Sequence, residues 1–77
     1  MDIKHGDILK RTHTNIKDNT STVDYFKVEK NKGAGFTLFL CDRQGNIFNR
    51  DSYDNKHYGA GHSFIQNKEW KWEVISD

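Results

Sequence analysis

The sequence predicts an all-β fold made of one strongly bent antiparallel sheet of about five strands. Several short segments alternate apolar and polar side chains, which is the two-residue period of a strand with one buried face. Clusters of glycine, asparagine and aspartate separate these segments, and such clusters are typical of turns. Because no segment carries a convincing long helical pattern, we expect strands joined by loops.

The clearest element lies between residues 35 and 50, where the pattern predicts a β-hairpin. Its first strand, residues 36–41, places Phe36, Leu38 and Leu40 on one face and Thr37, Phe39 and Cys41 on the other. A strand that is apolar on both faces belongs in the interior of a sheet. The turn 42–45 ends in Gly45, which we expect in the left-handed conformation, and residues 46–49 form the returning arm.

Two further strands are predicted before this hairpin. Residues 7–13 follow a glycine turn signal and form the expected first strand, and we expect the polar residues 14–22 to form a loop. Residues 23–29 place Phe26 and Val28 on one face and Tyr25, Lys27 and Glu29 on the other, as in a half-exposed strand. A helix is the alternative there, but β-favouring side chains dominate the segment.

The last strand is predicted over residues 69–75, where strict alternation sends Trp70, Trp72 and Val74 to one side of the sheet. Before it, residues 51–61 are mostly small and polar and predict a long loop. Residues 63–66 fit either a helical turn opened by a capping serine or a short strand, and the sequence leaves both open.

Gly6-Asp7-Ile8-Leu9 begins the first strand, the polar loop 14–22 follows it, and the tight turn 42–45 lies within the central hairpin. This order of parts resembles an SH3-like barrel, whose opening strand, long first loop and distal hairpin stand at these places. The resemblance implies that the sheet curls into a small barrel and so closes most of its edges. The chain departs from the pattern at residues 51–68, because such barrels join their last two strands through one short turn.

The length and charge of the chain limit its class. With 77 residues we expect a single domain, 1–77, that is too small for a large enclosed pocket. The net charge of +1 provides no long-range field for strong nonspecific binding of nucleic acid. No window is apolar enough for a membrane span or a secretion signal, and one cysteine makes no internal disulfide. We therefore expect a cytoplasmic protein without a membrane partner.

No strong catalytic, metal or cofactor motif is present. His57 and His62 could approach one metal, but the usual further ligands are absent nearby. Cys41 lies on an apolar strand, where a buried inert thiol is expected rather than a nucleophile. The glycine turns 33–35 and 59–61 precede no helix whose N-terminus could bind phosphate. We expect no enzymatic activity, no metal and no cofactor.

Binding of a protein partner is the function that this composition favours. Five phenylalanines, three tyrosines and two tryptophans are more rings than the inner faces of a small sheet can bury. We predict that exposed rings and an adjoining histidine contact the partner: Tyr25, Phe39, Tyr53, His57 and Tyr58. For Phe39 there is a competing interpretation, in which residues 51–68 cover the ring.

The alternative function is binding of RNA or single-stranded DNA. Basic residues stand on the first two predicted strands and the turn after them: Lys10, Arg11, Lys27, Lys30 and Lys32. Lysines could meet phosphates while nearby rings stack on unpaired bases. Asp24 and Glu29 interrupt this group of cations, which weakens the prediction.

The composition also suggests a biological setting. A compact chain without proline that is rich in asparagine, aspartate and lysine looks like the small accessory proteins of large tailed bacteriophages. Many of those proteins bind and inhibit host factors. The resemblance implies a phage-encoded inhibitor that engages and modulates a host protein.

Overall fold

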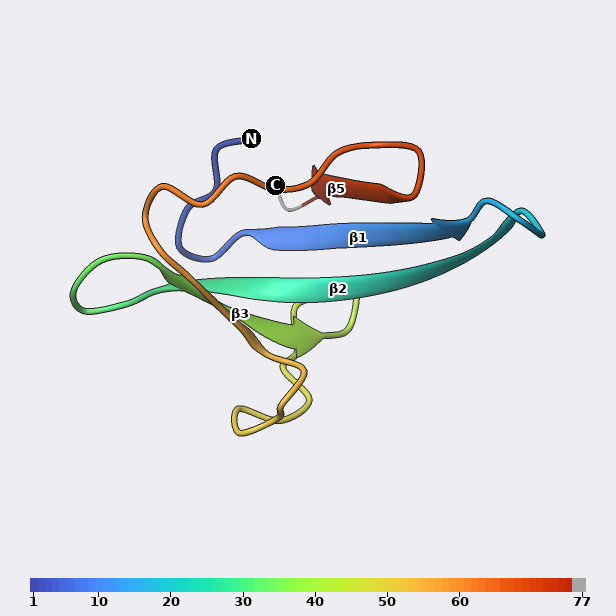
Figure 1. Ribbon diagram of the computed structural model, residues 1–77. Coiled ribbons are helices and arrows are strands. Elements are labelled where there is room, and N and C mark those ends of the chain that lie inside the picture. Colours follow the sequence, from blue (N-terminus) through green and yellow to red (C-terminus); the bar gives the residue numbers. More distant parts are fainter. Residues whose placement is uncertain (76–77) are drawn as a thin grey trace.

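The computed structural model describes residues 1–75 and confirms the all-β prediction. Its five strands are β1 (Ile8–Asn15), β2 (Thr20–Lys30), β3 (Phe36–Cys41), β4 (Lys56–Tyr58) and β5 (Trp70–Val74). Each neighbouring pair is antiparallel, and the order across the sheet is β4-β3-β2-β1-β5. The sheet curls strongly into a half-barrel that is compatible with an SH3-like barrel (Figure 1). Within the described residues there is no helix that could span a membrane.

Strand register divides the side chains between an inner, concave face and an outer, convex face. Leu9 lies opposite Phe26 and Val28 lies opposite Leu38, so these residues share the concave face. Trp72 joins them from β5, with its ring centroid 5.7 Å from that of Phe26. All five are buried and form the hydrophobic core. The alternations predicted for the second, third and last strands are therefore confirmed.

The first connection is shorter than predicted. β1 and β2 pair along their whole length, ending with Asn15 opposite Thr20, so the turn contains only residues 16–19. Asn19 has a φ of 62°, and its N–H donates to the Asn15 carbonyl at 2.7 Å. The expected loop 14–22 was wrong because threonine favours strands, and this end of the hairpin extends beyond the core with both faces in water.

The first arm and the turn of the 35–50 hairpin are confirmed, but residues 46–49 do not form a strand. Gly45 has a φ of 88°, as expected, and Asp42 Oδ1 accepts the N–H groups of Gln44 and Asn46, each at 2.9 Å. Beyond this turn the returning arm makes one isolated bridge, between Ile47 and Cys41. The chain then diverges from β3, and the free edge of β3 pairs with β4 instead. A strand thus lies inside the predicted loop 51–61.

Residues 59–69 join β4 to β5 by passing across the sheet (Figure 1). This long connection is where we expected the chain to depart from SH3-like barrels. Residues 63–66 form neither of the two predicted alternatives, a helical turn or a strand. Instead, Phe64 packs against the core, 4.9 Å from Trp72 between ring centroids, and anchors the connection over the concave face.

Candidate functional site

A cleft of about 230 Å³ opens on the concave face. Strands β1, β4 and β5 line it together with the 59–69 connection, through Arg11, Lys56, Tyr58, His62, Ile65, Trp70 and Trp72. We call this site the tryptophan cleft. Register explains its composition, because Arg11 lies opposite Trp72 and Lys56 lies opposite the core residue Leu38.

Arg11 places a cation among the rings of the cleft. Its guanidinium carbon lies 5.0 Å from the ring centroid of Phe26, 5.3 Å from that of Trp70 and 5.6 Å from that of Trp72. Its Nη2 donates to Asp24 Oδ2 at 2.7 Å. The Nε–H is buried and has no hydrogen-bond partner among the described residues. The ring contacts and the ion pair hold Arg11 in place, but leaving a buried donor unpaired costs stability.

Stacked rings form the wall of the cleft on the β4 side. The rings of Tyr58 and His62 lie parallel, 3.7 Å apart between centroids and 3° between planes. Phe64 meets both edge-on, at 5.6 Å and 4.9 Å. On the β5 side, the ring centroid of Trp70 lies 4.2 Å from that of His13. These contacts fix the rings before any ligand arrives, and fixed rings lose little entropy on binding.

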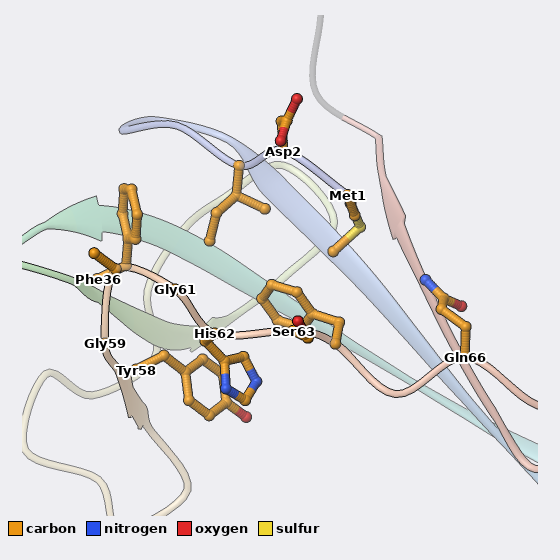
Figure 2. A pocket seen from close by; sticks show the side chains of 12 residues that line it. Met1, Asp2, Phe36, Tyr58, Gly59, Gly61, His62, Ser63 and Gln66 are labelled. Carbon is orange, nitrogen blue, oxygen red and sulfur yellow. The ribbon is translucent and has the colours of Figure 1, made fainter.

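A second hollow of about 430 Å³ shares Tyr58 and His62 with the tryptophan cleft. Figure 2 shows its lining, which comes from residues 1–3 and 58–64 with Phe36 and Gln66. Gln66 is already engaged, since its amide bonds the Trp72 backbone at 2.9 Å and 3.1 Å. No set of charged side chains converges in this hollow, so it is a weaker candidate than the tryptophan cleft.

The five residues predicted to contact a protein partner are spread over the molecule. Tyr25, Phe39 and His57 lie on the convex face, and His57 Nδ1 is 3.1 Å from the Thr37 hydroxyl. Tyr53 is fully exposed in the connection between β3 and β4. Of the five, only Tyr58 lines the tryptophan cleft.

Phe39 is half-buried, and an arginine packs over its ring. The Arg50 guanidinium lies over its ring, with the carbon 4.9 Å from the centroid. Both terminal nitrogens of that guanidinium donate to the Glu29 carboxylate, at 3.1 Å and 2.7 Å. These bonds from Arg50 hold the pKa of Glu29 below its ordinary value. The ring therefore contributes little free apolar surface.

The basic residues predicted to bind nucleic acid do not form one patch. Lys10 and Lys27 project from the convex face, whereas Arg11 lies on the concave face, paired with Asp24. Lys30 ends β2 opposite Phe36, and Lys32 is exposed in the next loop. Such a distribution gives no continuous track for a phosphate backbone.

Catalytic and metal chemistry find little support in the described residues. Cys41 is buried, as expected, and burial raises the pKa of its thiol to about 11, which keeps it protonated at neutral pH. His57 and His62 lie apart, one beside Thr37 and the other stacked on Tyr58. No group of three or more histidine, cysteine or carboxylate side chains within residues 1–75 is arranged to hold a metal ion.

Sequence reasoning missed most of the cleft. Neither tryptophan was predicted to bind a partner. Lys56 lies in the expected loop 51–61 and His62 directly follows it, whereas Ile65 lies in residues 63–66, for which a helical turn or a short strand was expected. One signal was available: two tryptophans on the same face of one strand are a large apolar surface for a small core to cover. The rest depends on the path of the 59–69 connection.

No protein-family model matches this chain, and neither a curated protein nor a solved structure matches it significantly.

Proposed function

We propose that this chain is a non-catalytic binding module whose tryptophan cleft receives a side chain of a protein partner. The supporting observation is that Trp70, Tyr58 and Arg11 meet around one opening. Tryptophan, tyrosine and arginine are the residue types that contribute most binding energy at protein interfaces. Ile65 adds apolar surface at the rim, where 62% of it is exposed.

The size of the cleft favours an anchoring side chain over a cofactor. Sites for small molecules commonly span about 300–1,000 Å³. At about 230 Å³ the tryptophan cleft lies below that range, which suits one large side chain or two small ones. A partner would bury the rest of its interface against the rims, where Ile65 and Trp70 exclude water around the anchor.

The proposed biological role rests on the resemblance to phage accessory proteins. On that basis the partner is a bacterial host protein, and this chain inhibits the host protein by binding to its surface. RNA binding is the alternative, but the predicted basic residues face different directions, and acidic residues stand among them. A continuous basic groove is what single-stranded nucleic acid requires.

Capture from a bacterial lysate tests this proposal. Ile65 and Ile16 offer a matched pair, since both are 62% exposed but Ile16 lies in the turn between β1 and β2, outside the cleft. We expect the immobilised wild-type chain and the Ile16→Asp variant to retain the same protein, identified by mass spectrometry. Ile65→Asp should lose at least about tenfold of that capture, because it places a charge in the apolar rim.

Nuclease treatment of the lysate separates the two functions. Capture of the protein should survive nuclease, because no nucleic acid bridges the contact. If only nucleic acid is retained, or if Ile16→Asp and Ile65→Asp behave alike, the cleft is not a protein-binding site.

A further inference from the structure

Resting on the proposed function, we infer that the tryptophan cleft accepts a peptide segment in which a carboxylate stands beside a large apolar side chain. The cleft is thus a docking site for a partner segment that carries both an acidic and an apolar side chain. Three features carry this inference: the unbalanced charge of the lining, the cost of desolvating that charge, and the arrangement of the rings.

The lining of the cleft contains two cations, Arg11 and Lys56, and no acidic residue. Asp24, outside the lining, bonds Arg11 at 2.7 Å and neutralises that charge. Lys56 lies on the concave face opposite Leu38 and forms no salt bridge with a described residue. One positive charge therefore remains uncompensated beside an apolar opening.

Covering this opening with a partner removes water from the Lys56 ammonium. A purely apolar occupant would leave that cation without a partner, and an unpaired charge is costly to desolvate. A carboxylate would replace the lost water with a charge-assisted hydrogen bond. The flexible lysine stem lets the ammonium reach an acid next to the anchored side chain. The site should reject basic segments for the same reason.

The rings suit an apolar side chain better than a nucleobase. Base stacking requires free ring faces. Tyr58 is stacked on His62 at 3.7 Å, and Trp70 is flanked by His13 at 4.2 Å and by the Arg11 guanidinium at 5.3 Å. The rest of the lining includes Ile65, whose apolar surface an aliphatic or aromatic side chain can contact in many orientations.

Selection from a random heptapeptide library displayed on beads tests the inference. The library is selected separately with the wild-type chain, Lys56→Gln and Lys32→Gln. Lys32 is the matched control, because it is an exposed lysine in the β2–β3 loop and its replacement removes the same charge outside the cleft.

The wild-type chain should enrich aspartate or glutamate next to tryptophan, phenylalanine or leucine. A selected peptide should bind about three- to tenfold more tightly than its amide counterpart, the effect of one charge-assisted contact. Lys56→Gln should abolish this preference while keeping the apolar one, and Lys32→Gln should behave as wild type. Absence of acidic enrichment, or its persistence in Lys56→Gln, overturns the inference, as does displacement of the peptides by oligouridylate.

This outcome is distinguishable from failure of the proposed function. If lysate capture still depends on Ile65 while the library shows no acidic preference, the cleft binds a protein but not through a carboxylate. If both experiments fail, neither the function nor its chemistry stands.

Discussion

Arg11 lies on the same face as the hydrophobic core, where arginine is seldom found. Its side chain is only 20% exposed and its Nε–H is unpaired among the described residues, while Asp24, at 41% exposure, balances the charge. Partly buried ion pairs contribute little net stability, since desolvation offsets most of the attraction. The pair should therefore contribute little to the net stability of the fold.

Replacing this pair should separate the two roles. Arg11→Met with Asp24→Asn keeps a long side chain among the rings, so we expect urea unfolding to change by less than about 1 kcal/mol. Capture of the protein partner should nevertheless fall at least about tenfold, because the cleft loses the guanidinium that packs among its rings. A loss of stability above about 2 kcal/mol would show that Arg11 serves the fold.

The convex face supplies the control for that experiment. Arg50 and Glu29 form a pair of the same length, 2.7 Å, away from the cleft. Arg50→Met with Glu29→Gln removes equivalent charges there, and partner capture should be unchanged.

At the scale of elements, one glycine allows the turn after β2 to approach the end of β4 closely. Gly35 has a φ of 86°, and a Cβ at this position would collide with the backbone oxygen of Tyr58. The turn after β2 therefore lies directly against the last residue of β4. This approach positions Tyr58, and with it one wall of the tryptophan cleft.

Gly35→Ala should therefore destabilise the chain by about 2–3 kcal/mol, from left-handed backbone strain combined with the collision. Gly33→Ala, in the same loop, meets no atom within 4 Å and should be neutral or slightly stabilising. Urea unfolding of the two variants measures the difference. Equal stability would mean that β4 moves away freely.

The outer edge of β5 is covered by side chains instead of another strand. The Gln66 amide donates to the Trp72 carbonyl at 2.9 Å and accepts the Trp72 N–H at 3.1 Å. Asn67 does the same for Trp70, accepting its N–H through Oδ1 and donating its own backbone N–H to the carbonyl, both at 2.9 Å. The edge is thereby protected from pairing with another chain.

Gln66→Ala should expose this edge. We expect a loss of about 1 kcal/mol in unfolding free energy, because two hydrogen bonds are replaced by bonds to water. We also expect stronger self-association than in wild type, measured by sedimentation over a range of concentrations. Gln44→Ala, on the exposed turn after β3, is the control. If the two variants sediment alike, Gln66 does not protect the edge.

The positions of most strands could be predicted from the sequence, but the pairing of the strands could be predicted only in part. A turn signal located β1, and alternation located the cores of β2, β3 and β5, since a buried face imposes its period on the sequence. β4 has three residues, too few for a pattern, and its pairing depends on the divergence of residues 46–49 from β3. Asn55 supports that arrangement because its side-chain oxygen accepts the Leu40 N–H at 3.0 Å. The two residues are far apart in the chain, so no local sequence pattern predicts this bond.

For the whole molecule, stability should depend on acidic groups that fix turns and faces. The pKa of Asp42 is lowered by hydrogen bonds from Asn46, and the pKa of Asp18 is lowered by hydrogen bonds from Thr20. The pKa of Glu29 is lowered by Arg50. Each pKa in the folded state lies below the pKa in the unfolded state. The contributions of these groups to folding stability are therefore complete above about pH 4–5 and disappear as the pH falls through the lowered pKa values.

We therefore expect unfolding free energy from urea titrations to decrease as the pH falls below about 4. Asp42→Asn should flatten part of this decrease, since it removes one group whose protonation is linked to unfolding. Asp54→Asn removes an exposed carboxylate that makes no hydrogen bond or ion pair with a described residue, and it should leave the acid limb unchanged. A wild-type stability independent of pH down to about 2 would contradict the expectation.

The sequence by itself determined the all-β class, the faces of β2, β3 and β5, the left-handed Gly45 turn and the burial of Cys41. These features follow from local periodicity and backbone sterics, which depend only on residues close together in the sequence. Only the tertiary structure decided that Arg11, Lys56, Ile65 and Trp70 share one cleft, and that Arg50 packs over Phe39. Those groupings depend on sheet curvature and on the path of residues 59–69, which arise from contacts between segments far apart in the chain.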